Sequence, residues 1–349
     1  YPFSRTALMY IFMGHVRFED TKLYEDWFWI KNRIELIKAW VKSINPSEKS
    51  ITLDNGSTVN YDKLIIASGS KPNKFSWPGQ DLQGVQGLYH LQDLAKKVQN
   101  SLGENYVVEY AMRYQNPSLE SALEKFRLQQ VNKIVVLPLF PQYSSACNGS
   151  VIQKVQEITS KWLTIPDLKY IHHFYDNEKF IDAFVAQGNK FNFDDFDHVL
   201  FSYHGLPARH LKNGDITKKH CLQNKDCCAT ITEINQHCYR AQCFETTRLI
   251  TEKLGLSKDK FTVTFQSRLG KEVWLEPYTV AVIPELAKQG KKKLLVFSPA
   301  FVADCLETLY EIRTEYLELF EEHGGESITL VESLNSEDKW VDAVCELVS

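Results

Sequence analysis

Five cysteines gathered in one short segment are the residues of this chain best suited to chemistry. They lie within 23 residues and are Cys221, Cys227, Cys228, Cys238 and Cys243. A disulfide framework is typical of short secreted chains with evenly spread cysteines, and this chain of 349 residues is neither. A structural zinc is disfavoured because the segment holds no Cys-x-x-Cys pair. The group therefore indicates a metal or iron–sulfur site, whereas Cys147, Cys305 and Cys345 are scattered and are expected to be ordinary buried thiols.

Polar and aromatic side chains follow several predicted strands. In parallel α/β sheets, ligands bind just beyond the carboxyl ends of the strands, so these side chains should share one rim. They are Arg113, Tyr114, Tyr143, Ser144, His204, Arg268 and Phe301. A neutral imidazole there, that of His204, can accept protons or help to hold a metal ion. A histidine hydrogen-bonded within a loop is the competing interpretation.

Three acids mark the start of a long predicted helix, 306–323. Asp304 and Glu307 resemble a capping box, and capping would explain both acids. Glu307 and Glu311 are also four residues apart, which places two like charges on one helix face. Such a pair should raise a pKa, which suits proton relay or metal handling. A solvated acidic helix start is the alternative.

Strands and helices alternate from residue 106 onward and must position these residues. The predicted strands are 106–112, 133–139, 170–174, 198–203, 261–265, 293–297 and 327–331, and the intervening helices include 119–126, capped by Ser118. This rhythm predicts an α/β fold with two doubly wound parallel-sheet (Rossmann-like) domains that divide near residue 190. Earlier in the chain, Asn55-Gly56 between apolar runs predicts a β-hairpin, and a buried strand is expected at 63–67.

Composition and charge limit the function classes. The chain is 44% hydrophobic and 12% aromatic, which is typical of a soluble globular protein and excludes a disordered one. The net charge of −4 gives no indication of the basic surface that binds the phosphates of nucleic acid. No eighteen apolar residues run together, and the apolar stretch 7–13 lacks the flanks of a signal peptide, so no transmembrane segment is expected. A cytoplasmic location fits reduced thiols, and peripheral membrane contact stays open.

Six stretches in fixed order carry a family resemblance. They are 111–114 (AMRY), 137–144 (LPLFPQYS), 202–207 (SYHGLP), 264–268 (TFQSR), 274–279 (WLEPYT) and 299–309 (PAFVADCLETL). Each is weak alone, but together they are highly specific. The sequence resembles the ferrochelatases, which insert ferrous iron into protoporphyrin in the last step of haem synthesis. The resemblance implies Fe2+ and protoporphyrin IX as substrates.

The resemblance also implies roles for the residues at the rim. His204 matches the active-site histidine of the family, Glu307 its catalytic glutamate and Glu311 its second relay acid, with His204 and Glu307 also meeting the iron. Trp274, Phe301 and Tyr143 would line an apolar slot for the flat macrocycle. Arg113 would bind a propionate bidentately, and Tyr114, Ser144 and Arg268 are further substrate-binding candidates. In the family mechanism, the porphyrin is bent out of plane so that a lone pair faces the metal.

The cysteine-rich insertion, 209–243, fits the same resemblance. Some bacterial ferrochelatases carry a 2Fe–2S cluster in a similar segment, with an end like the Cys-Tyr-Arg-Ala-Gln-Cys of 238–243. Four thiolates suffice, so one of the five is spare, and adjacent cysteines rarely serve one iron comfortably. The expected ligands are Cys221, Cys228, Cys238 and Cys243, with Cys227 as the alternate. Free thiols in a loop are the alternative.

Residues 1–93 resemble a different family. The stretches 61–73 (YDKLIIASGSKPN) and 77–79 (WPG) are similar to FAD-dependent pyridine nucleotide oxidoreductases. The phosphate-binding Gly-x-Gly-x-x-Gly turn is absent from the whole sequence, which argues against FAD binding. We therefore expect a chimera: 1–93 an oxidoreductase-like fragment, 94–190 a truncated first chelatase domain, and 191–349 a second domain whose last helix packs back on the first.

The sequence thus predicts a ferrochelatase of the lyase class. Two alternatives remain: an inactive chimera or iron–sulfur module, and a flavin-linked NAD(P)H oxidoreductase that only residues 1–93 favour. A truncated first domain would leave an orphaned sheet edge, so the activity of this chain is a separate question from its family.

Overall fold

The structure is a computed structural model that describes residues 31, 33, 35, 37, 39, 41–63, 91–114, 116–224, 226–270 and 272–349. It divides into two compact units, Tyr1–Lys71 and Pro72–Ser349. The first unit contains an antiparallel sheet of β1 (Val41–Asn45), β2 (Ser50–Leu53) and β3 (Thr58–Asn60). The predicted hairpin is confirmed: Gly56 turns between β2 and β3 with a φ of 82°, which favours glycine. The strand expected at 63–67 lies outside the described residues beyond Lys63.

The second unit begins with helices around a two-stranded parallel sheet. The elements are α3 (Leu91–Leu102), α4 (Leu119–Leu128), β4 (Lys133–Val136), the π-helix η2 (Ser145–Gly149), α5 (Ser150–Thr159), β5 (Asp167–Tyr170) and α6 (Glu178–Gly188). Ser118 is the N-cap of α4, as predicted, and its side chain accepts a hydrogen bond from the Ser121 N–H. β4 and β5 pair in parallel register, with Lys133 opposite Asp167.

The strand predicted at 106–112 does not form. Within the described residues, this stretch makes only one isolated bridge, between Met112 and Ser118. Its apolar residues suit a parallel strand, but a strand needs a neighbour to accept its hydrogen bonds, and the described sheet here consists of β4 and β5. The strand predicted at 170–174 lies three residues earlier, because the ladder with β4 runs from Lys133 opposite Asp167 to Val136 opposite Tyr170.

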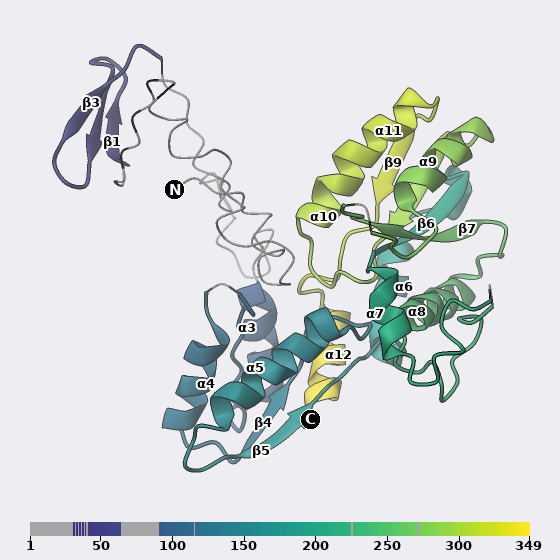
Figure 1. Cartoon of the computed structure of the whole chain (residues 1–349), viewed down its shortest axis with the longest axis horizontal. Coiled ribbons are helices and arrows are strands. Elements are labelled where there is room, and N and C mark those ends of the chain that lie inside the picture. The colour runs from purple at the N-terminus through teal and green to yellow at the C-terminus, as the bar shows by residue number, and fades with distance from the viewer. Residues whose placement is uncertain are drawn as a thin grey trace. The chain divides into compact units, whose positions relative to one another are not determined.

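A four-stranded parallel sheet forms the rest of the second unit. Its strands are β6 (His198–His204), β7 (Phe261–Gln266), β8 (Lys293–Phe297) and β9 (Ser327–Leu330), in the order β7-β6-β8-β9. The other elements are η3 (Phe193–Asp195), α7 (Ala208–Gly214), α8 (Tyr239–Leu254), α9 (Thr279–Lys288), α10 (Leu306–Leu309), the π-helix η4 (Glu311–Tyr316), α11 (Leu317–Glu322) and α12 (Asp338–Val348). The prediction of an α/β fold with parallel sheets is confirmed (Figure 1).

Both faces of the four-stranded sheet are covered by helices. Alternate residues of β6 point to opposite faces, so Leu200 packs in the cluster formed by α9, η4 and α11. Phe201 belongs to the cluster on the other face, where its ring stacks on Phe297 at 4.9 Å between centroids. Strands buried on both faces read as continuous apolar runs, which is why β6 and β8 could be predicted.

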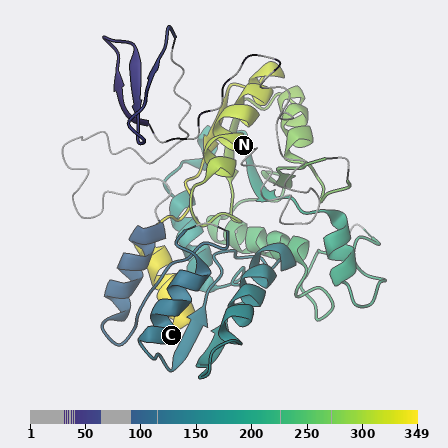
Figure 2. The ribbon, with the colours of Figure 1, turned by 60° about the vertical axis from the view of Figure 1, so that its left-hand side comes forward.

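Two features of the C-terminal part depart from a simple helix pattern. The single helix predicted at 306–323 is wrong, because the π-helix η4 interrupts it between α10 and α11. π-turns of this kind are frequent at functional sites. After β9 the chain leaves the four-stranded sheet, and α12 packs against α3 and α6, beside the elements of the first sheet (Figures 1 and 2).

Candidate functional site

His204 ends β6 at the carboxyl edge of the four-stranded sheet. Its register partner on β7 is Gln266, and its carbonyl accepts a hydrogen bond from the Tyr239 hydroxyl at 2.8 Å. The imidazole Nδ1 lies 2.6 Å from the Gly205 carbonyl oxygen. Because a carbonyl only accepts, Nδ1 carries the proton, and in the neutral ring Nε2 keeps its lone pair. The strand end therefore presents a half-buried, oriented base.

Two aromatic rings flank this imidazole. The ring centres of Trp274 and Phe301 lie 6.4 Å and 6.3 Å from that of His204. The backbone must pass close to Trp274 at Gly205, where an added Cβ would stand 2.8 Å from the Gln266 carbonyl oxygen and 3.1 Å from the indole Cε3. Glycine is thus required at 205 by close approach. The arrangement gives an apolar wall beside a base.

Glu307 lies in α10, next to the end of β7. Its carbonyl oxygen accepts a hydrogen bond from Gln266 Nε2 at 3.0 Å. Burial and the neighbouring Glu307 charge raise the pKa of the Cys305 thiol to about 12, so the thiol stays protonated. The capping alternative for Asp304 and Glu307 is wrong by one residue: Cys305 is the N-cap and Thr308 the N3 partner. Cys305 is therefore a site neighbour that its scattered position in the sequence did not indicate.

Glu311 is held by donors from two directions. Its Oε1 accepts from the Ser267 N–H at 2.9 Å and from the Tyr316 hydroxyl at 2.6 Å. Its Oε2 accepts from Ser267 Oγ at 2.7 Å and Gln266 Nε2 at 3.0 Å. Burial, followed by the Glu311 charge, raises the pKa of Tyr316 far above its usual value, which keeps this hydroxyl a donor. The π-helix η4 is thereby fastened to the end of β7.

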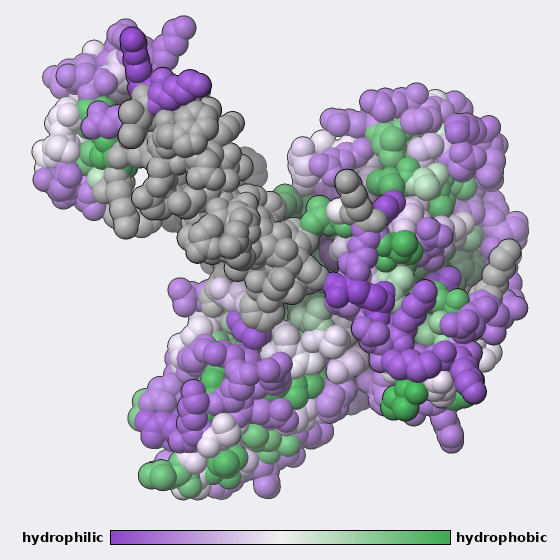
Figure 3. Space-filling view, in the orientation of Figure 1, coloured by the Kyte–Doolittle hydropathy of each residue, from purple (hydrophilic) through white to green (hydrophobic). Residues whose placement is uncertain are grey.

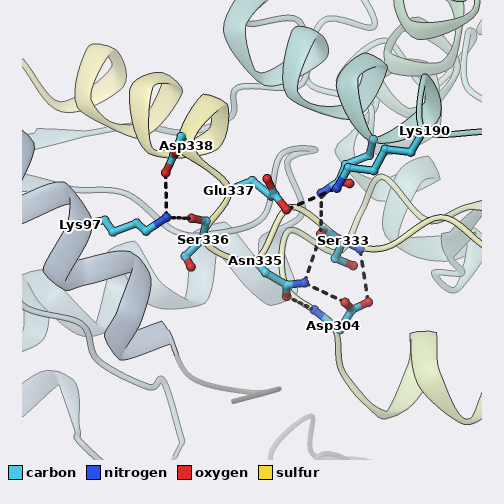
Figure 4. Close-up of polar contacts among 9 residues, drawn as sticks. Lys97, Lys190, Asp304, Ser333, Asn335, Ser336, Glu337 and Asp338 are labelled. Carbon is cyan, nitrogen blue, oxygen red and sulfur yellow. Dashed lines mark hydrogen bonds and ion pairs between the residues drawn. The ribbon is translucent and has the colours of Figure 1, made fainter. Parts of the chain in front are cut away.

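Asp304 does not cap α10. It binds Ser333 and Asn335 instead, in the segment that connects β9 with α12. Its Oδ2 accepts from Asn335 Nδ2 at 2.8 Å, and its N–H donates to Asn335 Oδ1 at 2.9 Å. The Ser333 N–H and the Thr308 hydroxyl donate to Oδ1. Figure 4 shows the contacts from Asn335 and Ser333 converging on the buried carboxylate. The segment that leads from Phe301 into α10 is thus tied to residues 333–335.

The segment that connects β9 with α12 is also bound to residues of α3 and of the end of α6, which pack beside the first sheet. Lys97 of α3 donates to the Ser336 carbonyl at 2.9 Å and to Asp338 at 2.7 Å (Figure 4). Lys190, just after α6, pairs with Glu337 at 3.4 Å. These pairs are exposed and contribute little stability singly, but they fix the direction in which the chain leaves Asp304.

The predicted residues from the first sheet gather around η2. Arg113 Nε donates to the Ser150 carbonyl at 3.1 Å, and its guanidinium lies 4.6 Å from the Tyr114 ring centre. The Tyr114 hydroxyl is 3.4 Å from Ser150 Oγ. Ser144 is buried and caps η2, since its Oγ accepts from the Cys147 N–H. Ser144 therefore has a structural use that the rim pattern did not reveal.

The first turn of α8 connects this group with His204. The Tyr143 N–H donates to Gln242 Oε1 at 2.6 Å, and the hydroxyl of Tyr239, in the same turn, donates to the His204 carbonyl. Arg268, by contrast, is exposed, with its guanidinium 4.7 Å from the Tyr278 ring centre. Gln266, Tyr239 and Gln242 were missed as site residues, although all three lie within the quoted motifs.

The cysteine thiols of the insertion lie close to one another. Cys227 Sγ is 3.6 Å from Cys228 Sγ. A hydrogen bond with Cys238 lowers the pKa of Cys221, and another raises that of Cys228. Cys243 is fully buried and lies beside Tyr239. Within the described ranges, no three or more His, Cys, Asp or Glu side chains are arranged to hold a metal ion.

Comparison with known proteins identifies the family. Residues 88–349 match the ferrochelatase family model. A ferrochelatase of Pseudomonas fluorescens (strain SBW25) is 42% identical over 255 residues, which are 72% of this chain and 75% of the relative. That of Legionella pneumophila (strain Paris) is 42% identical over 268 residues, or 76% of this chain and 78% of the relative. The chain belongs to the ferrochelatase family.

The beginning of this ferrochelatase-family chain matches another family. Residues 2–109 match the model of pyridine nucleotide-disulphide oxidoreductases, which bears out the resemblance of the first ninety residues. Among solved structures, SirB from Bacillus subtilis with Fe3+ covers 74% of this chain at 14% identity, with a TM-score of 0.49. No helix in the described part of the chain has both the length and the apolar character needed to cross a membrane.

Proposed function

We propose that this chain inserts Fe2+ into protoporphyrin IX to form protohaem. The observation that carries the proposal is the oriented imidazole of His204 between the rings of Trp274 and Phe301, in a chain of the ferrochelatase family. A flat macrocycle against these rings would bring its pyrrole nitrogens to the base. Fe2+ and the porphyrin are the two substrates of the reaction.

The proton balance assigns the roles of the base and the acids. Two pyrrole N–H protons leave as Fe2+ enters, so the protein must remove two protons from an apolar slot. His204 accepts a proton at Nε2, because Nδ1 is already occupied by the hydrogen bond to Gly205. Glu307 and Glu311 carry protons onward from His204, and Glu307 shares with His204 the approach of the iron. Gln266 contacts both acidic positions and holds them in place.

Substrate binding completes the proposal. Trp274, Phe301 and Tyr143 form the walls of the slot. The Arg113 guanidinium, anchored on the Ser150 carbonyl, pairs with a propionate, and Tyr114, Ser144 and Arg268 are secondary contacts. Contacts at the edge of the ring bend the porphyrin and expose a nitrogen lone pair to the metal.

We further propose that four cysteines of the insertion hold a 2Fe–2S cluster. The hydrogen bonds of Cys238 with Cys221 and with Cys228 support this, because neighbouring cysteine thiolates are the donor set of such clusters. Cys243 is the fourth ligand, with Cys227 as the alternate. A cluster of this kind exchanges one electron at a time, and none of the chelation steps above requires it. The division of the chain at residues 93 and 190 and a cytoplasmic location are further proposals, and peripheral membrane contact stays open.

An insertion assay tests the chelatase function. Porphyrin metallation by the full chain is followed by absorbance, with Fe2+ under anaerobic conditions and with Zn2+. We expect His204→Ala to abolish turnover and His323→Ala, an exposed histidine bonded to the Leu319 carbonyl, to leave it unchanged. No turnover from folded protein would instead support an inactive chimera. Flavin that copurifies with the chain would support the oxidoreductase alternative.

An absorption spectrum of anaerobically purified protein tests the cluster. Charge-transfer bands of a 2Fe–2S cluster should be present in the wild type and in Cys345→Ser, which changes a cysteine outside the segment. They should be lost in Cys221→Ser, Cys228→Ser, Cys238→Ser and Cys243→Ser. If the bands were lost in Cys227→Ser and retained in Cys228→Ser, Cys227 would be the ligand in place of Cys228. Wild-type protein that contains no iron or sulfide would refute the cluster proposal.

A further inference from the structure

A cavity of about 400 Å³ lies between the cysteine segment and the loop that carries Trp274. Three charged side chains line it: Lys212 of α7, Arg240 of α8, and Glu276. Its apolar walls include Leu222, Val273 and Trp274. This volume, with apolar walls and a few polar groups, is typical of small-molecule sites. We call it the α7–α8 cavity.

The charges of the α7–α8 cavity favour an anion. Lys212 and Arg240 outnumber Glu276, so the lining carries one net positive charge. Among the ion pairs between described residues, none involves these three side chains, although Arg209 and Glu272 pair nearby. Cations that share a cavity without bonded carboxylates raise the local concentration of anions. The chain as a whole has a net charge of −4, so this is a local departure from its overall balance.

Arg240 is held in a fixed orientation. Its guanidinium lies 4.6 Å from the ring centre of Phe244, on the next turn of α8. A stacked guanidinium loses less side-chain entropy when it binds a carboxylate, sulfonate or phosphate than a free lysine does. Lys212 is exposed on α7. Figure 3 shows hydrophilic residues over much of the face turned to the viewer. A ligand can therefore enter from water and meet one fixed and one mobile cation.

We propose that the α7–α8 cavity binds a small organic anion with an apolar body. The anionic group pairs with Arg240 and Lys212, and the apolar body packs against Leu222 and Trp274. Glu276 opposes a second negative charge and so favours monoanions. Trp274 lines this cavity and also stands 6.4 Å from the His204 ring, so a bound anion contacts a wall of the proposed porphyrin slot. The site shares Trp274 with the proposed porphyrin slot, but its charged residues, Lys212, Arg240 and Glu276, have no role in the proposed chelation.

Titration with 8-anilinonaphthalene-1-sulfonate tests the proposal, because this probe combines an apolar body with one negative charge and fluoresces when it leaves water. Lys212→Ala should weaken binding about two- to fivefold, as expected for one partly exposed charge. Glu276→Gln should tighten it by a similar factor. Lys219→Ala removes an exposed lysine of the same segment outside the cavity and should leave the dissociation constant unchanged. All variants change exposed side chains, so their folding should match that of the wild type.

Ionic strength adds an independent readout. Raising the salt concentration should weaken probe binding to the wild type more than to Lys212→Ala, because added salt screens the missing charge. Equal dissociation constants for Lys212→Ala and Lys219→Ala would overturn the proposal, as would no gain in Glu276→Gln. Probe that binds other apolar surfaces contributes equally in every variant. The test uses no porphyrin, iron or cluster, so its outcome is independent of the chelatase proposal.

Discussion

Replacing Glu311 with glutamine tests whether its carboxylate is the fastening point between η4 and β7. Four donors reach this side chain: the Ser267 N–H, the Ser267 hydroxyl, the Gln266 amide and the Tyr316 hydroxyl. Hydrogen bonds to a charged group contribute about 1.5–3 kcal/mol each, against about 0.5–1.5 for neutral pairs. Loss of the charge should thus cost on the order of 1–2 kcal/mol after allowance for non-additivity.

The shape of the amide adds a second cost. With the glutamine oxygen in the place of Oε1, its NH2 group faces Ser267 Oγ, which can rotate to accept, and Gln266 Nε2, which cannot. Rotating Gln266 would break its acceptor contact with Ser202 Oγ at 2.7 Å. One donor is therefore left unpaired, at about 1–3 kcal/mol. We expect a total of about 3 kcal/mol.

Thermal unfolding followed by circular dichroism measures this loss. At about 2–4 °C per kcal/mol for a domain of this size, the midpoint for Glu311→Gln should fall by about 6–12 °C. Glu315→Gln is the matched control, because Glu315 is exposed on the same π-helix and its substitution should change the midpoint by less than about 2 °C. A Glu311→Gln midpoint within about 2 °C of the wild type would refute the reasoning. If insertion activity were then lost, Glu311 would act in proton transfer alone.

Three further substitutions probe the site and the sheet. Gly205→Ala should reduce porphyrin metallation at least about tenfold, because the new Cβ would stand 2.8 Å from the Gln266 carbonyl oxygen. The control Gly214→Ala adds a Cβ that meets no atom within 4 Å and should leave activity unchanged, so equal activities of the two variants would contradict this. Tyr239→Phe removes the bond to the His204 carbonyl and should lower stability by about 1 kcal/mol in urea unfolding, with a larger loss in kcat than in porphyrin affinity; unchanged kinetics would show that this bond does not orient His204. Burial, and then the nearby lysines, lower the pKa of His198. The neutral imidazole therefore contributes stability above the unfolded-state pKa of about 6.5, and this stability is lost as the pH falls below that value. His198→Gln should reduce the drop in unfolding midpoint between pH 7.5 and 5.5, and an unchanged drop would assign it to other groups.

Local patterns carried much of the fold. Ser118 before an amphipathic run predicted the cap of α4, Asn55-Gly56 predicted the hairpin turn, and the apolar run ending at His204 predicted β6. These signals depend on residues adjacent in the chain, so no tertiary contact is needed to read them. The placement of His204 at a strand end followed from the same run.

Other features depend on neighbours that lie far away in the sequence. The stretch 106–112 has the apolar character of a strand, yet no described strand pairs with it. The helix expected from 306 contains a π-turn, and Glu311 at its start accepts hydrogen bonds from Ser267 and Gln266, more than forty residues earlier. Asp304 matched a capping pattern, but its carboxylate binds Asn335 instead. Helical periodicity could not foresee any of these contacts.

The sequence by itself determined the family, because six short motifs in fixed order leave few alternatives, and it determined which residues end the strands. Only the tertiary structure decided which of them meet. It placed His204 between Trp274 and Phe301, used Ser144 as a cap, and left Arg268 exposed. The reason is physical: a strand end specifies where a side chain starts, but its neighbours across the sheet, fixed by the β7-β6-β8-β9 order, specify what it touches.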